Sequence, residues 1–591
     1  MKPDDPSALD EPTRVEMPAD LPSWARRLYE LYISGTTSMF VLHGNTHDLV
    51  RSGDEGRFTV LSEFLAEQLF GRWDLVLHYD LARGLRPLAG SDRERLKKMV
   101  VLANEKLGDI AELGKSPAAV MPLLDRMINY NIMAEEKDRI SIAVLFDHVS
   151  HIAPHADPGR LSLAASTQLV TLLNWATSPH VKHLNMAIVL MDEQLTALSN
   201  RLTGNPHVAA VEIPLPDIDS REAFVRRAVG SRDIEEFSDF DVPGLAKLTA
   251  GMTLADINVL IRTAVNVGRR LDEAAFRALK KRLLERQCQG LLEYVEPKWS
   301  LDMVIGHEAA KERLREDAAL LARGELRSLP MGYLVCGAVG TGKSFLAQCA
   351  SGEIGVPCVM LKNFRSKYVG ETEGNLERVL SVLRAMGPVV VIVDEADAAL
   401  GDRDQGGDSG TSNRVFAMIA AQMGNTRYRG RILWMLLTCR PDLLPIDIKR
   451  QGRAEVHIPL FYPSDQNEVR DLFVAMARKM GTKLEPADVP PIPQRGDLSG
   501  ADIEGIVGRA WRKSLLAGED RVTRADLAGV LAQFMPSTQG LERELQETAA
   551  IIECTDKRFL PEAIRSRVDA PGERAKLQER LTALKQLVEA L

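Results

Sequence analysis

One ordered set of features occurs twice in the sequence, and this repeat constrains the fold more than any other feature. A short apolar run ends in Asp147 and a similar one ends in Asp394. The stretch GMTLADINVLIRTA carries Asp256, and GDLSGADIEGIVGRA carries Asp502. With Pro214 of EIPLPD and Pro459 of HIPLFYP, these pairs recur in the same order at a separation of about 246 residues. Three matches at nearly one separation indicate two copies of a single module.

The length of each copy suits a parallel-sheet α/β domain followed by a small helical domain, which gives about four domains in 591 residues. We expect the first module at residues 31–290 and the second at 291–540. Residues 1–30 are acidic and proline-rich, which is typical of a disordered or extended segment. Residues 541–591 predict a helical extension. Its last apolar residues follow a heptad spacing too briefly for a coiled coil, so we expect it to dock onto its own chain or a neighbouring subunit.

The composition excludes several classes of protein. With 45% hydrophobic and 26% charged residues, the chain has the balance of an ordinary globular protein. Its net charge of −8 argues against a general affinity for nucleic acid. The six cysteines form no CxxC pair, which favours buried, reduced thiols. The N-terminus lacks the apolar core of a signal peptide, and no apolar run approaches the roughly 18 residues of a membrane span. We therefore expect a cytoplasmic protein with no membrane partner.

The second copy contains a phosphate-binding loop. YLVCG predicts a buried strand, GAVGTGKS follows it, and FLAQCASGEIG predicts a helix. In this P-loop (Walker A) context, glycines let backbone N–H groups approach phosphate oxygens, and the helix N-terminus favours an anion. Lys343 is expected to contact the β- and γ-phosphates of ATP, and the Ser344 hydroxyl to bind Mg²⁺. The nucleotide-binding residues predicted here are Gly337, Ala338, Val339, Gly340, Thr341, Gly342, Lys343, Ser344 and Phe345.

An acidic strand end (a Walker B motif) completes this predicted site. VVVIVDE is apolar up to its last two residues, as expected for a strand buried on both faces of a parallel sheet. Asp394 would hold Mg²⁺ through water, and Glu395 would orient and deprotonate the attacking water. Phosphoryl transfer depends on this kind of positioning and charge neutralisation.

On these motifs, residues 299–590 resemble an ATPase module of the AAA family. WSLDMVIGHEAAKERL resembles the family's opening segment, which implies that its VIG residues line the adenine pocket. LSGADIEGIV resembles the helix start of the small domain that faces the nucleotide. The additional nucleotide-binding residues that the resemblance implies are Val304, Ile305, Gly306, Gly500 and Ala501.

The resemblance also implies an oligomer. TCRPDLLPIDIKRQGR resembles the family stretch ending in RPGR, so Arg450 and Arg453 would be arginine fingers that reach the γ-phosphate bound by a neighbouring subunit. Such fingers imply a head-to-tail homo-oligomer, which in this family is a hexameric ring. One position departs from the family pattern, since Cys439 stands where asparagine is usual. Cysteine polarises water poorly, so that either Thr438 substitutes for it or hydrolysis is slow.

A segment between the two motifs suggests how the energy is used. SKYVGETEGN resembles the pore loop of AAA protein remodellers, which implies that Tyr368, Val369 and Gly370 project into a central channel. An aromatic side chain there would grip a client polypeptide through apolar contact. A surface turn with one buried tyrosine is the structural alternative. The glycine-rich stretch 400–413 has two interpretations, a second pore loop or a solvated insert.

The first copy lacks the corresponding chemical groups. FVLHGNTHDLV predicts its first strand, but no GK[ST] follows Gly44, and a longer stretch before the acidic strand indicates an insertion. His148 stands where Glu395 stands in the second copy. Asn205 stands where the RPGR arginine is expected, with Arg201 out of register. We expect this module to have lost hydrolysis and nucleotide binding and to act as a scaffold.

The run DHVSHIAPH allows a competing interpretation of the same stretch. Asp147, His148, His151 and His155 carry atoms that transition metals prefer, but zinc sites usually combine a close pair with ligands from distant parts of the chain. The interpretation as a degenerate ATPase module also explains the strand before the run, and we prefer it.

The sequence thus predicts a Mg²⁺-dependent ATPase with tandem AAA modules that unfolds, remodels or disassembles a client protein. The main alternative is a scaffold or assembly factor controlled by ATP binding with slow turnover, which Cys439 and the inactive first module favour. A nucleic-acid motor is a third possibility, disfavoured by the acidic net charge.

Overall fold

The computed structural model divides into two compact units, Met1–Phe276 and Arg277–Leu591, and each is described by itself. Side chains of residues 111, 369–372 and 409–413 are outside the description. The structure describes residues 21–590 except 54–55, 157–158, 160, 183, 269, 297, 363–368, 401–408, 464, 493–497 and 536–539.

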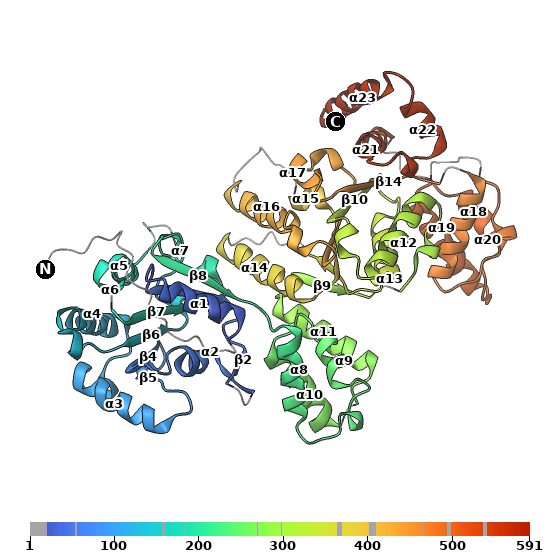
Figure 1. Ribbon diagram of the computed structural model, residues 1–591. Helices are drawn as coiled ribbons and strands as arrows, with labels where there is room; N and C mark the ends of the chain where they lie inside the picture. The colour runs from blue at the N-terminus through green and yellow to red at the C-terminus, as the bar shows by residue number, and fades with distance from the viewer. Residues whose placement is uncertain are drawn as a thin grey trace. The chain divides into compact units, whose positions relative to one another are not determined.

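The first unit is built on a six-stranded sheet (Figure 1). All neighbouring strands are parallel except β5, which pairs antiparallel to β4. In spatial order the strands are β5 (Gly84–Pro87), β4 (Leu75–Asp80), β6 (Ile142–Phe146), β7 (Met186–Met191), β1 (Met39–Gly44) and β8 (Val208–Ile213).

Apolar strands flanked by amphipathic helices give this unit its core. Every residue of β6 and β7 is buried, as expected for strands covered on both faces. Helices before and after β6 contribute buried leucines and methionines to the same cluster. The helices of this domain are α1 (Ser23–Ile33), α2 (Leu61–Phe64), α3 (Arg93–Leu107), α4 (Pro117–Met133), α5 (Leu163–Thr177), α6 (Pro179–Lys182) and α7 (Asn200–Thr203).

The second unit contains a six-stranded sheet whose five parallel strands have the same connectivity as those of the first. Its strands are parallel except β9, which pairs antiparallel to β11. In spatial order they are β14 (Val456–Leu460), β10 (Gly332–Gly337), β13 (Ile432–Thr438), β12 (Val389–Val393), β11 (Cys358–Leu361) and β9 (Leu292–Val295). The chain order of the five parallel strands is identical in the two sheets, which confirms two tandem modules of one α/β fold.

The two α/β domains differ in the connection that precedes the acidic strand. One helix, α14, lies between β11 and β12, whereas β5, α3 and α4 lie between β4 and β6. The predicted insertion in the first copy is therefore confirmed. The second set of helices is α12 (Glu308–Ala322), α13 (Lys343–Ile354), α14 (Val369–Ala385), α15 (Ala396–Leu400), α16 (Ser409–Met423) and α17 (Ile446–Lys449).

The strand register corrects one match of the predicted repeat. Gly44 pairs with Ile213 in the first sheet, and Gly337 pairs with Leu460 in the second. The counterpart of Pro214 is therefore the residue after Leu460, and the match of Pro214 with Pro459 was wrong by two positions. Proline is tolerated at Pro459 because β14 is an edge strand, where one side of the backbone needs no partner from the sheet.

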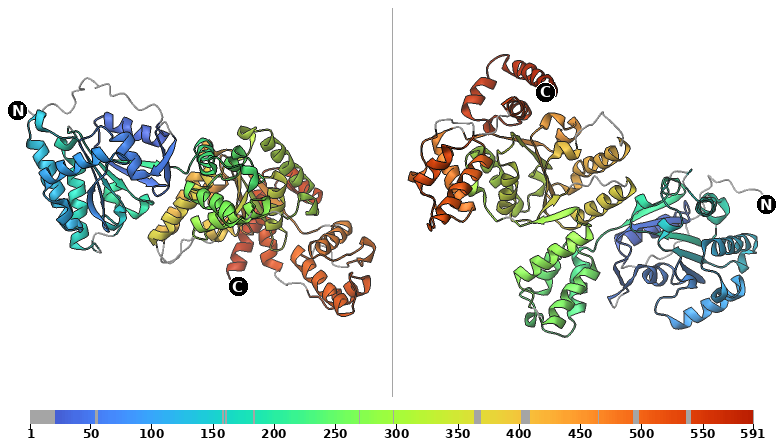
Figure 2. Two further views of the ribbon diagram at one scale, coloured as in Figure 1. Left: turned by 90° about the horizontal axis from the view of Figure 1, so that it is seen from below. Right: turned by 180° about the vertical axis from the view of Figure 1, so that it is seen from behind.

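Each α/β domain is followed by a small helical region, shown in green and in orange in Figure 2. Thr253 caps α10 by accepting a hydrogen bond from the backbone N–H of Asp256, and Ser499 caps α19 in the same way through Asp502. The third match of the repeat is therefore a shared helix cap. These helices are α8 (Ile218–Val229), α9 (Val242–Leu248), α10 (Leu254–Val267) and α11 (Glu273–Gln287) in the first copy, and α18 (Gln466–Lys479), α19 (Gly500–Leu516) and α20 (Arg524–Leu531) in the second.

The C-terminal extension docks onto its own chain, one of the two expected arrangements. It consists of α21 (Gly540–Glu553), α22 (Glu562–Val568) and α23 (Glu573–Glu589). Helix α21 packs on α23 and also on β10 and β14. Lys585 pairs with Asp442 at 3.0 Å, which ties α23 to the α/β domain.

The cysteines and the apolar character of the helices bear on the expectations drawn from composition. All six cysteines are free, and Cys288, Cys336, Cys349 and Cys358 are buried, as expected for reduced core thiols. Burial raises the pKa of the Cys349 thiol to about 12, which makes it a weak nucleophile. Among the described residues, no helix has both the length and the apolar character needed to cross a membrane.

The docking of α23 can be tested with a pair of leucines. Leu584 is fully buried, whereas Leu587 is 47% exposed on the same helix. Leu584→Ala should destabilise the packing of α23 on α21 by about 2–5 kcal/mol, and Leu587→Ala should change it by less than about 0.5 kcal/mol. Hydrogen exchange of the α21 and α23 peptides measures both effects. Equal exchange rates in the two variants would contradict this docking.

Candidate active site

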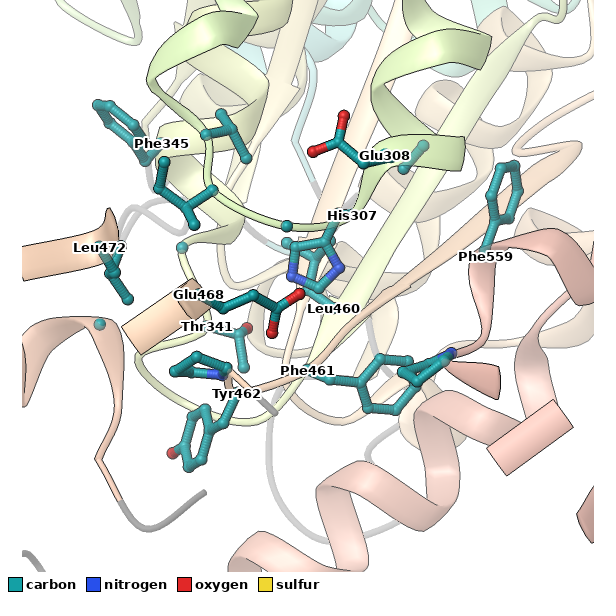
Figure 3. Close-up of a pocket in the computed structure, with 18 of the residues that line it drawn as sticks. His307, Glu308, Thr341, Phe345, Leu460, Phe461, Tyr462, Glu468, Leu472 and Phe559 are labelled. Carbon is teal, nitrogen blue, oxygen red and sulfur yellow. The ribbon is translucent and has the colours of Figure 1, made fainter. Parts of the chain in front are cut away.

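A cavity of about 600 Å³ lies in the second unit where the P-loop faces the small helical domain (Figure 3). Its lining combines backbone from the glycine-rich loop with apolar side chains from several elements. Nine of the predicted nucleotide-binding residues line it: Val304, Ile305, Gly306, Gly340, Thr341, Gly342, Phe345, Gly500 and Ala501. The other predicted residues, Gly337, Ala338, Val339, Lys343 and Ser344, belong to the same loop and helix start but are not part of the lining.

The loop shape depends on its glycines. Gly337, Gly340 and Gly342 have φ values of 147°, 83° and 87°, a region that other residues rarely adopt. A Cβ on Gly337 would meet the carbonyl oxygen of Leu460 at 2.3 Å, and one on Gly340 would meet Ser499 Cβ at 2.7 Å. Glycine therefore lets the loop pass against both β14 and the start of α19. The sequence GAVGTGKS has glycine at each of these three positions.

Two separate elements bring the reactive groups together. Ser344, in the first turn of α13, donates its hydroxyl to Asp394 Oδ2 at 2.7 Å. Lys343 is buried and its Nζ donates to the carbonyl oxygens of Gly337 and Ala338 at 2.9 and 2.8 Å. A hydroxyl beside a carboxylate is the oxygen donor set that Mg²⁺ prefers, so Ser344 and Asp394 fit this ion.

Glu395 has a strained backbone. Its φ is 49°, uncommon for a residue other than glycine, and its N–H donates to Asp394 Oδ1 at 2.9 Å. This conformation leaves the Glu395 side chain exposed next to the buried strand end. Strained conformations of this kind cluster at active sites, where they aim a side chain.

At the neighbouring strand end, Thr438 faces a carboxylate. The buried Thr438 hydroxyl donates to Asp397 Oδ1 at 2.7 Å and accepts the Arg440 N–H at 2.8 Å. Cys439 is only half-buried. The Thr438 hydroxyl thus connects the end of β13 to the start of α15.

The two predicted arginine fingers lie outside this cavity. Arg450 follows α17 with its side chain 57% exposed and 3.4 Å from Asp447. Arg453 is 13% exposed, and its Nη1 donates to the Asp447 carbonyl at 2.9 Å. Neither arginine lines the cavity of its own chain.

The predicted pore loop falls largely outside the described residues. Tyr368 is not among them, and neither is the stretch 401–408 of the glycine-rich insert. Val369 and Gly370 are the first two residues of α14.

Part of the cavity was not predicted from the sequence. Phe559 and Leu560, in the C-terminal extension, line it together with Phe461, which follows β14 (Figure 3). In the same region the Val339 N–H donates to Gln546 Oε1 at 3.0 Å, so α21 contacts the P-loop itself. No local motif marks these residues, because they reach the cavity only through the docking of the extension.

His307 is another cavity residue that the sequence analysis did not predict. Burial lowers the pKa of its imidazole, which favours the neutral form. Its ring points into the cavity beside Glu468 in Figure 3, and it follows the predicted segment Val304–Gly306 directly. Its φ of 56° places it in the same uncommon region as Glu395.

The first unit repeats the acidic strand end but not the P-loop. The His148 N–H donates to Asp147 Oδ1 at 2.9 Å and His148 has a φ of 54°, which matches the geometry of the second unit. After Gly44, however, the chain forms the hairpin β2 (Leu49–Ser52) and β3 (Arg57–Val60). Asp48 accepts the N–H groups of Leu254 and Ala255 at 2.8 and 3.0 Å. A carboxylate thus lies at the N-terminus of α10, where an anionic phosphate would otherwise be favoured.

His47 and Asp147 form an ion pair at this edge. Hydrogen bonds to Asp147 and Glu193 raise the pKa of His47 to about 10. Although burial raises the pKa of Asp147, the neighbouring His47 and His78 hold it well below its usual range.

Comparison with known proteins agrees with this geometry. The family model "AAA+ chaperone, N-terminal Rossmann-like domain" matches residues 11–214, "AAA+ chaperone, second helical domain" matches 219–289, and "ATPase family associated with various cellular activities (AAA)" matches 333–462. The chain belongs to the AAA family of ATPases. The matched families place two AAA modules in tandem.

Relatives of this AAA protein include a cell division cycle protein 48 homolog of Archaeoglobus fulgidus, 23% identical over 64% of this chain and 55% of that protein. An uncharacterized AAA domain-containing protein, ycf46, of Trieres chinensis is 26% identical over 50% of this chain and 60% of its own. ATP-dependent zinc metalloprotease FtsH 3 of Sphaerobacter thermophilus is 27% identical over 44% and 55%. The chain thus spans a little over half the length of these relatives.

The close approach of the P-loop to α19 can be tested with a pair of glycines. Gly340 and Gly355 both have positive φ, so alanine strains the backbone by about 1–2 kcal/mol at either position. Only at Gly340 does the new Cβ also meet Ser499, whereas at Gly355 it meets nothing within 4 Å. Gly340→Ala should weaken ATP binding at least tenfold and Gly355→Ala should leave it unchanged, as measured by titration with a fluorescent ATP analogue. Similar affinities in both variants would contradict a binding role for this approach.

Proposed function

We propose that the second AAA module hydrolyses ATP to ADP and phosphate with Mg²⁺ and uses this energy to remodel a client protein. The hydrogen bond between Ser344 and Asp394 carries the proposal, because it joins the P-loop helix to the acidic strand end beside Glu395. A P-loop or an acidic strand alone occurs in many proteins. Their junction next to a cavity of about 600 Å³ is the arrangement that nucleotide hydrolysis needs.

Each residue of the proposed site would have a separate role in hydrolysis. Lys343 would exchange its contacts with the Gly337 and Ala338 carbonyls for phosphate oxygens. Ser344 and Asp394 would hold Mg²⁺, which when bound neutralises charge on the phosphates. Glu395, exposed at the end of β12, would orient the attacking water and accept its proton.

The base-binding end of the cavity would be apolar. Val304–Gly306 line the cavity together with the aromatic residues Phe461 and Phe559. Stacking on aromatic rings and backbone hydrogen bonds suit a purine base. The C-terminal extension would therefore contribute directly to nucleotide affinity.

We further propose a homo-oligomeric, hexameric ring. The exposed Arg450 lies outside the cavity of its own chain, which supports a role on a neighbouring subunit. Arg453 would need to leave its contact with Asp447 to act as a second finger. An arginine finger supplied in trans contributes on the order of 10³ to 10⁵ in rate.

The client would be gripped by Tyr368, Val369 and Gly370 in the channel of this ring. Support comes from the sequence SKYVGETEGN and from the chaperone families matched by the first unit. The first module, with Asp48 at the helix N-terminus in place of a phosphate cradle, would act as a scaffold rather than a second motor.

A scaffold controlled by ATP binding is the second candidate function. Cys439, which stands where asparagine is usual in the family, favours it, since a half-buried thiol is a poor substitute for an amide. The two functions differ in turnover, because the scaffold needs ATP binding only.

Two complementary variants test hydrolysis and the trans arrangement together. Glu395→Gln should bind ATP but lower turnover at least about 100-fold, and Arg450→Ala should lower it by about 10³-fold. When the two are co-expressed with different tags and co-purified, Glu395→Gln subunits supply Arg450 to neighbours that retain Glu395. We expect the mixed oligomer to recover a measurable fraction of wild-type turnover in a phosphate-release assay.

The control for this mixture is each variant purified alone. A mixed oligomer no more active than its parents would contradict the trans role of Arg450. Wild-type turnover no higher than that of Glu395→Gln, despite ATP binding, would instead favour the scaffold.

A client trap tests the remodelling function. Glu395→Gln bound to ATP should retain a client during purification, whereas Glu395→Gln combined with Tyr368→Ala should lose it, because the aromatic grip is removed. Mass spectrometry of the two preparations identifies the difference. Identical partners in both would show binding outside the predicted pore loop and contradict a threading mechanism.

A further inference from the structure

A cluster of metal-binding side chains lies in the first unit at the carboxyl ends of the parallel strands. His47 follows β1, and Asp147 and His148 follow β6. One ligand atom from each of these three residues lies within 4.8 Å of the other two. His47 Nε2 is 3.7 Å from Asp147 Oδ1, and the rings of His47 and His148 are 4.9 Å apart. The sequence run alone offered no distant ligand, and the fold supplies one in His47.

His47 is oriented by a second carboxylate. Its Nδ1 lies 2.9 Å from Glu193 Oε1, at the end of β7, and its Nε2 faces Asp147. In metal sites a ligating histidine almost always donates its other N–H to a carboxylate or carbonyl, which fixes the ring and its tautomer. The Glu193–His47 pair already has this arrangement.

A buried histidine points into the same cluster with one of its two ring nitrogens unpaired. His78, on β4, is 3% exposed, and its Nε2 makes no hydrogen bond. Arg86 donates to His78 Nδ1 at 3.1 Å, so the neutral ring carries its proton on Nε2, which points at Asp147 Oδ2 from 3.8 Å. An unpaired buried donor is costly. A small inward shift of Asp147 would give this N–H its acceptor.

The cluster belongs to the first module only. With Asp147 and Asp394 as equivalent positions, the pairing of Val76 with Ala143 and of Cys358 with Val390 makes Met360 the counterpart of His78. The pairing of β1 and β10 with their neighbours makes Gly340 the counterpart of His47. The module that keeps its P-loop therefore has neither histidine.

We propose that His47, Asp147 and His148 bind a divalent transition-metal ion of the zinc class, with Glu193 and His78 orienting two of the ligands. Two imidazoles and one carboxylate form a ligand set that favours such ions over Mg²⁺ or Ca²⁺. Tetrahedral coordination needs ligand atoms about 3.4 Å apart, at metal distances of about 2.0–2.1 Å. The exposed rings of His47 and His148 can move to bring the ligand atoms to this separation. A water molecule would then occupy the fourth coordination position.

The ion would occupy the sheet edge that corresponds to the Ser344–Asp394 junction of the second module. There it would connect the loop after β1 with the end of β6. The first module would thus use a resident cation to join two elements that a nucleotide and Mg²⁺ would join in the second. This inference does not depend on the hydrolysis proposed above.

Cobalt is a suitable probe, because Co²⁺ in a tetrahedral site with nitrogen ligands absorbs visible light strongly. The 591-residue chain is titrated with Co²⁺ in excess Mg²⁺, which would saturate the oxygen-ligand site proposed in the second module. We expect one equivalent of Co²⁺ to develop the band, and Zn²⁺ to abolish it by displacement. His47→Ala and His148→Gly should each weaken Co²⁺ binding at least tenfold. Glycine at position 148 retains the positive φ, and both side chains are exposed, so the fold should tolerate these changes.

His151→Ala is the matched control, since His151 belongs to the same sequence run and is exposed but lies outside the cluster. It should retain wild-type Co²⁺ affinity. The absence of a stoichiometric band in the wild-type chain would overturn the proposal. A band that persists in His47→Ala and His148→Gly would overturn it as well.

Discussion

The hydrogen bond between Ser344 and Asp394 is the contact on which the organisation of the candidate site in the second module depends. It joins the first turn of α13 to the end of β12. Helix α13 lies between β10 and β11 in the chain, so the bond connects parts of the sheet that are not consecutive. The strained Glu395 follows from the same geometry, because the chain must leave the strand in a left-handed conformation to close its N–H on Asp394. Once these groups are fixed, the P-loop side of the cavity, the Ser344–Asp394 pair and the exposed Glu395 carboxylate lie at one edge of the sheet.

The first module keeps the frame of this arrangement and changes its chemistry. Asp147 and His148 have the same backbone geometry as Asp394 and Glu395. Asp147 faces His47 and His78 rather than a serine hydroxyl. The hairpin β2–β3 lies between β1 and α2 in place of the P-loop, and Asp48 accepts hydrogen bonds at the N-terminus of α10. The sheet keeps its form with a different loop after β1, since it and its core are held by buried apolar residues.

Local motifs predicted what local geometry determines. The strand before GAVGTGKS, the helix after it, the buried strand VVVIVDE and the cap at Ser499 all follow from patterns within about 20 residues, and the structure contains each of them. The offset of Pro214 was wrong because register is set by pairing between strands, which sequence spacing does not record. Phe559 and His47 were missed as site residues for a related reason, since each reaches its site only through packing across a long stretch of chain.

The central claim is that only one of two modules with the same sheet topology retains a nucleotide site. The number of ATP molecules bound per chain at saturation, with Mg²⁺ present and hydrolysis blocked by Glu395→Gln, tests it most directly. Equilibrium dialysis or native mass spectrometry should give one ATP per chain, and none when Lys343→Ala is added. Two ATP molecules per chain, or one that remains bound after Lys343→Ala, would contradict the assignment of the first module as a nucleotide-free scaffold.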